Sequence, residues 1–270
     1  MAVELNQQKL LAALTAERKY DYLPFSLHIF NNVTSTNLVA WDLINQGAGV
    51  GTVVIATEQT AGRGQWGRQW VSQTGGLYLS VAITPNLAAN LSYQLTLASA
   101  WGIADQLREC GIDIGIKWPN DLVLDGRKLG GILTETKVNQ GMITQAVIGV
   151  GINWTNPVPE TGINLQSWQA NQPHQPISCL EMLICQVLLG IESGITCLCQ
   201  EGVSILLSRY IELLVNMGDR VYVNNLAGTI IGVTPQGDLR VTFETESIND
   251  IRTQEISLEP GKISLGYRKS

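Results

Sequence analysis

Residues 52–83 read TVVIATEQTAGRGQWGRQWVSQTGGLYLSVAI, and two fold classes can be compared on them. Residues 62–67 have the glycine spacing G-x-G-x-x-G of dinucleotide-binding loops, which requires a strand before the glycines and a helix that begins at them. The β-branched residues 52–56 favour the strand. Residues 76–83, however, alternate and favour a second strand, and no carboxylate follows at about twenty residues to bind a ribose. The segment therefore predicts two strands joined by a glycine-rich loop, and it argues against NAD binding.

The remainder of the chain up to residue 217 predicts an α+β domain built on a mixed or antiparallel sheet. Its apolar residues recur with the helical period in some segments and alternate as in strands in others, and capping residues mark the ends of helices. The helices are expected at residues 7–18, after the N-cap candidates 34–37, and at 91–110, 178–199 and 201–216. The further strands are expected at residues 27–30, 113–117, 121–125, 128–137 and 142–151, with Asp125-Gly126 as a hairpin turn.

From Gly218 the pattern changes to short alternating strands separated by turn residues. Such a pattern is typical of a small all-β domain, and we expect it to be barrel-like. We therefore expect an N-terminal helical extension over residues 1–25, a main domain over 26–217 and a small C-terminal barrel over 218–270.

Composition narrows the class of protein. The chain has 270 residues, of which 45% are hydrophobic and 15% charged, and this balance is ordinary for a globular protein. A net charge of −6 argues against a general nucleic-acid-binding surface. The most apolar later segment, residues 182–191, is too short to span a bilayer, and the N-terminus lacks the features of a signal peptide. We expect no membrane association.

The five cysteines form an odd set without zinc spacing, which fits free thiols in a reducing cytoplasm. Cys197-x-Cys199 has two interpretations, a metal or redox pair and simple core packing, and its apolar helical surroundings favour packing. The chain has only two histidines, His28 and His174, and this argues against a histidine-based triad or a multi-histidine metal site.

Three segments contain residue types that a core does not require. Residues 58–70 combine glycines with Arg63, whose planar guanidinium suits a carboxylate or a phosphate, although a flexible hairpin tip is the alternative. Residues 117–135 place Lys128 and a Gly-Gly pair in a strand, where glycine often marks close approach of a ligand. An exposed turn lysine beside a bulge is the alternative there. Residues 147–154 end in glycines and an asparagine, which a glycine-rich sheet centre would explain equally well.

Together these segments resemble the biotin protein ligase family, called biotin–[acetyl-CoA-carboxylase] ligase in bacteria. The resemblance is carried by Ser35-Thr36-Asn37, GRGQWGRQW at 62–70, KWPNDLVLDGRKLGGILTE at 117–135 and VIGVGIN at 147–153, and it extends from about residue 26 to the end. It implies a class II synthetase-like core of α+β type with a small SH3-like barrel. It also implies that biotin and ATP form biotinyl-5′-AMP, from which biotin passes to a lysine of a biotin carboxyl carrier protein.

In that reaction a carboxylate meets an anionic triphosphate, so positioned cations and Mg²⁺ are needed more than acid–base side chains. The resemblance implies catalytic roles for Lys128 and Arg63, and it makes Asp121 the candidate for the metal and for the base. The residues implied for biotin binding are Ser35, Thr36, Asn37, Gln59, Gly62, Arg63, Trp70, Lys128, Gly130 and Gly131. Those implied for nucleotide binding are Arg63, Gln65, Arg68, Trp70, Asn120, Asp121, Lys128 and Asn153.

The sequence departs from the family pattern in two respects. Gln65 stands where the family frequently has arginine, which suggests that loop packing more than charge holds the intermediate; a leakier adenylate is the alternative. Some members also carry an N-terminal winged-helix domain, whereas about 25 residues precede the first matching strand here and include no basic recognition helix. We expect no DNA binding, while a monomer and a homodimer both stay open.

Two other functions compete with this interpretation. A lipoate or octanoate ligase would share the general fold, but it gives no reason for GRGxxGRxW followed by KWPND. A biotin sensor without catalysis would have no use for an ATP site. Release of pyrophosphate that depends on ATP and biotin, and not on lipoate, separates the three.

Overall fold

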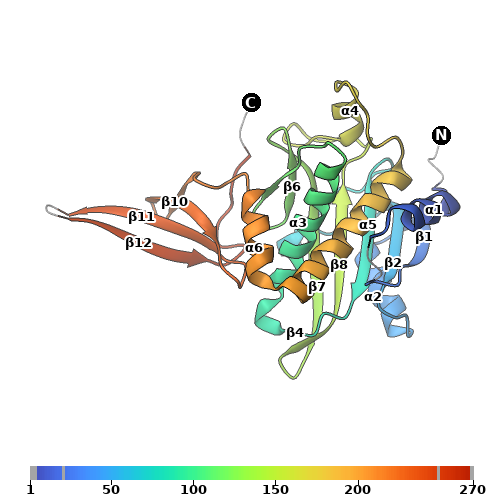
Figure 1. Cartoon of the computed structure of the whole chain (residues 1–270), viewed down its shortest axis with the longest axis horizontal. Helices are drawn as coiled ribbons and strands as arrows, with labels where there is room; N and C mark the ends of the chain where they lie inside the picture. The colour runs from blue at the N-terminus through green and yellow to red at the C-terminus, as the bar shows by residue number, and fades with distance from the viewer. Residues whose placement is uncertain (1–4, 20–21, 248–249, 268–270) are drawn as a thin grey trace.

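The computed structural model describes residues 5–19, 22–247 and 250–267, and it shows the predicted α+β fold (Figure 1). Among these residues, an eight-stranded sheet has the strand order β1-β2-β3-β8-β7-β6-β5, with β4 paired to β8 beside this path. The β1–β2 pair is parallel and the other pairs are antiparallel. The strands are β1 Ser26–Val33, β2 Thr52–Gln59, β3 Leu77–Ile83, β4 Leu87–Ala88, β5 Gly115–Lys117, β6 Asp121–Leu124, β7 Arg127–Asn139 and β8 Met142–Ile152.

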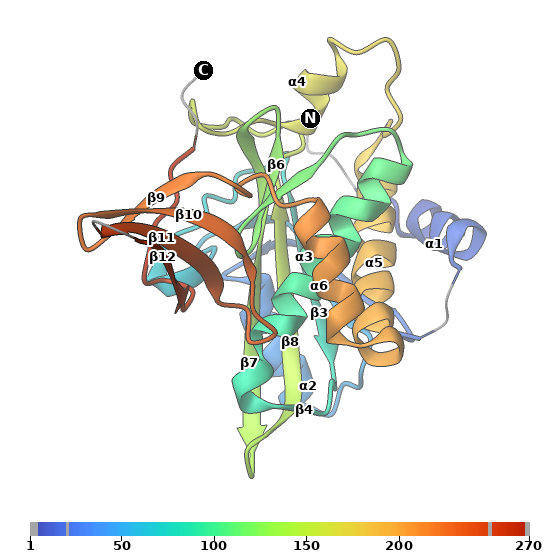
Figure 2. The same ribbon diagram turned by 60° about the vertical axis from the view of Figure 1, so that its left-hand side comes forward.

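Helices cover both faces of this sheet, because its central strands bury alternate residues on opposite faces. On β2, Val53 and Ile55 belong to the large core beneath α3 and α5, whereas Val54 belongs to a smaller cluster beneath α2. Figure 2 shows α3, α5 and α6 together on one side of the sheet. The helices are α1 Gln7–Glu17, α2 Thr36–Asn45, α3 Tyr93–Glu109, α4 Leu165–Gln169, α5 Leu180–Thr196 and α6 Val203–Glu212.

Helices α3 and α5 cross in backbone contact. A Cβ atom added to Gly102 would overlap the carbonyl oxygen of Gly190, and one added to Gly194 would overlap that of Ala98. These glycines therefore let the two helices approach more closely than side chains allow. The result is a tightly packed layer on the face of the sheet opposite α2.

Helix α5 lies where the sequence predicted a helix at 178–199. With the π-helical turn Cys197–Glu201, it forms a 22-residue helix from Leu180 to Glu201 that, unlike residues 182–191 alone, passes the length and composition test for a membrane span. In its most apolar window 83% of the residues are buried inside the fold, as in the core helix of a soluble protein. Cys197 is buried there and Cys199 is exposed, and both are free thiols. The described residues contain no group of three or more His, Cys, Asp or Glu that could hold a metal, which leaves the metal interpretation of this pair without support.

The predicted small β domain is present after Gly218. Its strands form an antiparallel sheet in the order β12-β11-β10-β9, and this hydrogen-bonded path ends in two edges instead of closing into a barrel. The β11–β12 hairpin projects away from the main sheet in Figure 1. Residues of β10 and β11 share one core with α6, including Ile230, Leu239 and Leu206. The strands are β9 Arg220–Val223, β10 Leu226–Val233, β11 Leu239–Ser247 and β12 Asp250–Leu258.

The predicted ranges 1–25 and 218–270 include residues 1–4, 20–21, 248–249 and 268–270, which lie outside the described residues. Residues 259–267, here called the C-terminal tail, leave β12 and return toward the main sheet, where they meet the pocket described next.

Candidate active site

A pocket lies where the glycine-rich loop, the start of α2, strands β6 to β8 and the C-terminal tail meet. It gathers most of the residues that the sequence singled out, although they come from segments far apart in the chain. The predicted site residues that line it are Ser35, Thr36, Asn37, Gln59, Arg63, Gln65, Arg68, Trp70, Asn120, Asp121, Lys128 and Gly131.

Three predicted residues do not line the pocket but support it. Gly62 accepts a hydrogen bond from the Trp70 amide at 3.0 Å and so closes the base of the loop. A Cβ atom on Gly130 would lie 2.7 Å from the carbonyl oxygen of Gly151. The Asn153 amide donates to the Leu129 carbonyl at 2.9 Å, and this asparagine is buried.

One end of the pocket has a floor of buried polar side chains. The Thr36 amide and hydroxyl donate to Gln59 Oε1 at 2.8 and 3.1 Å, and Gln59 Nε2 donates to the Ser72 hydroxyl at 2.7 Å. The fully buried Ser80 hydroxyl lies 2.8 Å from Thr36 Oγ1 and 2.6 Å from Asn37 Oδ1. Each side chain thus has a fixed orientation, because its neighbours determine which polar atom faces the pocket.

Sequence reasoning missed Ser80, although a serine in the middle of the apolar strand β3 is a signal for a buried polar role. It also left the glycines of β8 unexplained. A Cβ atom on Gly149 would overlap Asn37 Oδ1, and one on Gly151 would lie 2.5 Å from Trp70 Nε1. These glycines therefore make room for two site residues, which decides against the interpretation as a plain glycine-rich sheet centre.

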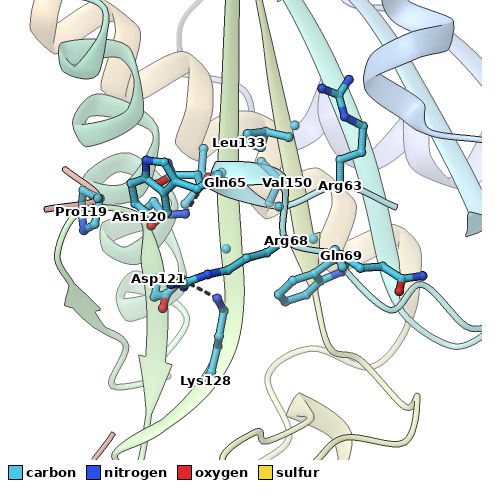
Figure 3. Close-up of a pocket in the computed structure, with 18 of the residues that line it drawn as sticks. Arg63, Gln65, Arg68, Gln69, Pro119, Asn120, Asp121, Lys128, Leu133 and Val150 are labelled. Carbon is cyan, nitrogen blue, oxygen red and sulfur yellow. Dashed lines mark hydrogen bonds and ion pairs between the residues drawn. The ribbon is translucent and has the colours of Figure 1, made fainter. Parts of the chain in front are cut away.

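The other end of the pocket is positively charged. The Lys128 ammonium lies 2.5 Å from Asp121 Oδ1 and 5.3 Å from the centroid of the Trp70 ring. Arg68 extends toward the same carboxylate in Figure 3, and Lys117 also lines this end. Asp121 is the one carboxylate among the described lining residues, so three cations share a single anion. Such an arrangement favours an anionic ligand.

The pKa of Lys117 is lowered to about 8, mainly by burial; the charge of Asp121 opposes this shift, and the charges of Lys128 and Arg68 add to it. The ammonium group of Lys117 is thus held where its charge is costly. A ligand that brings negative charge to this position would relieve that cost. Lys117 belongs to the KWPND motif, but neither the residue pattern nor the resemblance assigned it a role of its own.

The strand pairing explains how these groups meet. In the β5–β6 hairpin Lys117 stands opposite Asp121, and on the next strand Asp121 stands opposite Gly131. A Cβ atom on Gly131 would lie 3.5 Å from Lys128 Nζ, so the absence of a side chain leaves space beside that ammonium. The predicted turn Asp125-Gly126 closes β6 and β7 with φ angles of 47° and 71°, as a primed hairpin turn requires.

The glycine-rich loop is folded back on itself. The Gly64 amide donates to the Arg68 carbonyl at 2.7 Å, and Trp66 has a left-handed φ of 54° at the tip. Gln65 Oε1 and Trp70 Nε1 are buried but have no hydrogen-bond partner. Because unpaired buried polar atoms are uncommon, these two atoms mark positions where a polar ligand or water would bind.

Arg63 lines the pocket, but its guanidinium pairs with a residue of β7. The resemblance implies that this guanidinium binds the carboxylate and the phosphate, whereas its Nη2 atom lies 3.0 Å from Glu135 Oε1. Figure 3 shows the Arg63 side chain pointing away from Lys128 and Asp121. Glu135 lies at the end of the quoted 117–135 motif, and the half-buried carboxylate needs a cation, which the loop arginine provides.

The C-terminal tail forms part of the site, and no sequence motif indicated this. Gly261, Ile263, Ser264 and Leu265 line the pocket. Tyr267 donates a hydrogen bond from its hydroxyl to Asp121 Oδ2, 146 residues away in the chain. The small β domain therefore contributes through its tail to the cationic end of the pocket.

Comparisons with known proteins agree with the geometry. The sequence model of the biotin/lipoate A/B protein ligase family matches residues 29–153. The bifunctional ligase/repressor BirA of Bacillus subtilis is 41% identical over 128 residues, which are 46% of this chain and 39% of that protein. Escherichia coli BirA is 32% identical over 220 residues, which are 79% of this chain and 68% of that one.

A biotin–[acetyl-CoA-carboxylase] ligase of Paracoccus denitrificans is 36% identical over 112 residues, which are 40% of this chain and 46% of that protein. The chain thus spans about two fifths of the length of the Bacillus relative. Among solved structures, the biotin protein ligase of Aquifex aeolicus in complex with biotin and ATP superposes with a TM-score of 0.68 at 24% identity. The superposition covers 90% of this chain and 99% of that one, and it supports the fold.

Proposed function

Because this chain belongs to the biotin/lipoate A/B protein ligase family, we propose that it is an ATP-dependent biotin–protein ligase. In the first step a carboxylate oxygen of biotin attacks the α-phosphorus of ATP, and pyrophosphate leaves. In the second step the amine of an acceptor lysine attacks the acyl carbon of biotinyl-5′-AMP, and AMP leaves. The observation that carries the proposal is the presence, in one pocket, of a buried polar floor beside a cation cluster.

The polar floor suits the ureido group of biotin, which is neutral and has both donors and acceptors. Thr36, Asn37 and Gln59 offer hydroxyl and amide groups whose orientation is fixed by Ser80 and Ser72. A lipoyl dithiolane ring has no comparable hydrogen-bonding groups, so a lipoate ligase would gain nothing from this floor. The floor therefore favours biotin within the family.

The cation cluster suits the reacting anions. Lys128 would lie beside the carboxylate and the α-phosphate, and Lys117 and Arg68 would neutralise further phosphate charge. Such positioned charges stabilise the developing charge of the transition state without moving. Trp70 would cover the ligand and exclude water, which would otherwise hydrolyse the mixed anhydride.

Magnesium would reach the site mainly through the phosphate oxygens of ATP. The described residues offer one lining carboxylate, Asp121, and this group already pairs with Lys128 and Tyr267. Mg²⁺ commonly keeps several waters and binds through one or two carboxylates together with substrate phosphates. The donor set thus fits a substrate-borne ion and not a site formed by protein ligands alone.

We propose the biotin carboxyl carrier protein of acetyl-CoA carboxylase as the acceptor. The name of the Paracoccus relative supports this choice, and the free thiols fit a cytoplasmic location. The net charge of −6 supports a protein that does not bind DNA, and retention of an operator fragment in a mobility-shift assay at physiological salt would contradict that part.

The test is the intact mass of a biotin carrier domain incubated with this protein, biotin, ATP and magnesium. We expect a gain of one biotin, and a loss of about 10²- to 10³-fold in rate with Lys128→Ala. Lys137→Ala is the matched control, since Lys137 lies on the same strand but bonds to Asn45 outside the pocket. Absence of any mass gain, with biotin still bound in calorimetry, would replace the ligase by a biotin sensor.

A further inference from the structure

Glu135 lies on β7 between the buried start of α2 and the glycine-rich loop at the pocket. Both of its carboxylate oxygens are used, and by different elements. Oε2 accepts a hydrogen bond from Asn37 Nδ2 at 2.8 Å, and Oε1 pairs with Arg63 Nη2 at 3.0 Å. The Glu135 side chain is 22% exposed and that of Arg63 is 46% exposed, so the pair sits at the rim of the pocket.

The Asn37 side of this arrangement is rigid. Asn37 is 3% exposed, and its Oδ1 atom lies 2.6 Å from the hydroxyl of the fully buried Ser80. It also occupies the space that the missing side chain of Gly149 leaves open. Glu135 is therefore anchored by the same buried groups that form the polar floor.

The Arg63 side leads into the loop. Arg63 forms an antiparallel bridge with Gln69, and the flanking residues Gly62 and Gly64 bond to Trp70 and Arg68 across the loop. An ion pair that fixes Arg63 against β7 therefore also fixes the opposite arm of the loop, residues 68–70. That arm carries Arg68 and Trp70, which face Lys128 at the cationic end.

We propose that Glu135 is a positioning residue that fixes the loop over the pocket by holding Arg63, and that Arg63 acts through this ion pair instead of by contact with the ligand. Glu135 then connects the polar floor, through Asn37, to the arm that carries Arg68 and Trp70. Charge neutralisation of the ligand falls to Arg68, Lys117 and Lys128. The role in ligand retention rests on the proposed ligase function, whereas the role in loop order does not.

The test compares the natural protein with Glu135→Gln, Arg63→Gln and the double variant. Glutamine keeps the shape of Glu135 and can still accept from Asn37, so it removes the charge alone. In the ligand-free protein, we expect hydrogen exchange of the amides of residues 62–70 to become about three- to tenfold faster in each variant. Exchange in α3 and α5 should stay unchanged, which shows that the fold is intact.

The second measurement is the release of biotinyl-5′-AMP. Each single variant should release it about three- to tenfold faster, and the double variant should release it no faster than the worse single one. Glu109→Gln is the matched control, because Glu109 forms an exposed ion pair with Lys19 away from the pocket.

The direction in which Glu135→Gln changes the rate of adenylate release distinguishes the two possible roles of Arg63. If Arg63 holds the ligand directly, freeing it from Glu135 leaves adenylate release unchanged or slows it, while Arg63→Gln alone speeds it. That result, or unchanged exchange of the loop in Glu135→Gln, would overturn the proposal. Failure of the chain to form any adenylate would overturn the ligase function, and the ligand-free exchange data would still test the role of Glu135.

Discussion

The ammonium group of Lys117 lies 3.5 Å from the centroid of the Tyr267 ring. Tyr267 also donates its hydroxyl hydrogen bond to Asp121, the residue that stands opposite Lys117 in the β5–β6 hairpin. A buried cation of the main sheet is thus covered by an aromatic ring from the C-terminal tail. The cationic end of the pocket is complete only when the tail lies in this position.

The charge of Lys117 should give ATP use a distinctive pH dependence. Its pKa is lowered to about 8, so the side chain is charged below that pH and neutral above it. We expect kcat/KM for ATP to fall by up to about tenfold per pH unit above pH 8, because this parameter reports the free enzyme. In Lys117→Arg, which stays charged, the fall should disappear. An unchanged profile in this variant would remove Lys117 as its origin.

The contribution of Lys117 to folding stability should change with pH in the opposite direction, rising where kcat/KM for ATP falls. The unfolded chain binds the Lys117 proton up to about pH 10.5, whereas the folded chain loses it near pH 8. The unfolded state therefore binds more protons between these values, and the contribution of Lys117 to stability rises with pH across this window. We expect the free energy of unfolding in urea to differ less between the natural protein and Lys117→Met at about pH 10 than at about pH 7.5, the two ends of this window.

Removing the Tyr267 ring should weaken ATP binding and leave biotin binding intact. We expect Tyr267→Ala to raise KM for ATP by about two- to thirtyfold, the range of a cation–π contact that is exposed or desolvated. Tyr267→Phe keeps the ring, so its KM for ATP should lie between those of the natural protein and of Tyr267→Ala. Initial-rate kinetics and biotin calorimetry check this, and a lower KM for ATP in Tyr267→Ala would mean that the tail blocks the nucleotide.

Gly151 should not tolerate even a methyl group. A Cβ atom there would lie 2.5 Å from Trp70 Nε1, so the indole must move. Overpacking of this kind costs about 1–3 kcal/mol, and we expect biotin affinity in Gly151→Ala to fall accordingly in calorimetry. Gly49→Ala is the control, since nothing lies within 4 Å of its added Cβ. Equal affinities of the two variants would show that Trp70 does not cover the ligand.

The loop should hold the adenylate by packing more than by the charge at position 65. Trp66 lies against the tail, where a Cβ atom on Gly261 would be 2.6 Å from Trp66 Nε1. We expect Trp66→Ala to speed adenylate release, and Gln65→Arg to change it by less than about fivefold. If Gln65→Arg slowed adenylate release strongly, measured with labelled biotin, the natural protein would instead be one that loses its adenylate faster for want of this charge.

Local patterns in the sequence predicted the sheet, the glycine-rich loop and the Asp125-Gly126 turn, because alternation and turn residues act over a few positions. They also selected most of the pocket residues through the family motifs. They did not predict Tyr267, whose partner Asp121 is 146 residues away, since no local pattern reports such a contact.

Arg63 shows a second limit of sequence reasoning. Its place in the motif identified the loop, but the direction of its guanidinium depends on Glu135, a residue of another strand. Helix α5 shows a third, because the length and composition of Leu180–Glu201 also suit a membrane span, and its burial inside the fold distinguishes the two. In both cases the tertiary neighbours decided what the residue pattern left open.

The glycine crossing of α3 and α5 has a consequence for the calorimetry of ligand binding. At Gly102, Gly190 and Gly194 the two backbones already touch, so this crossing has no side chains that could repack when a ligand enters. The negative heat-capacity change that accompanies burial of apolar surface must then arise on the pocket side, where Trp66 and the tail are still partly open to water. Its size would measure how far the loop and the tail close.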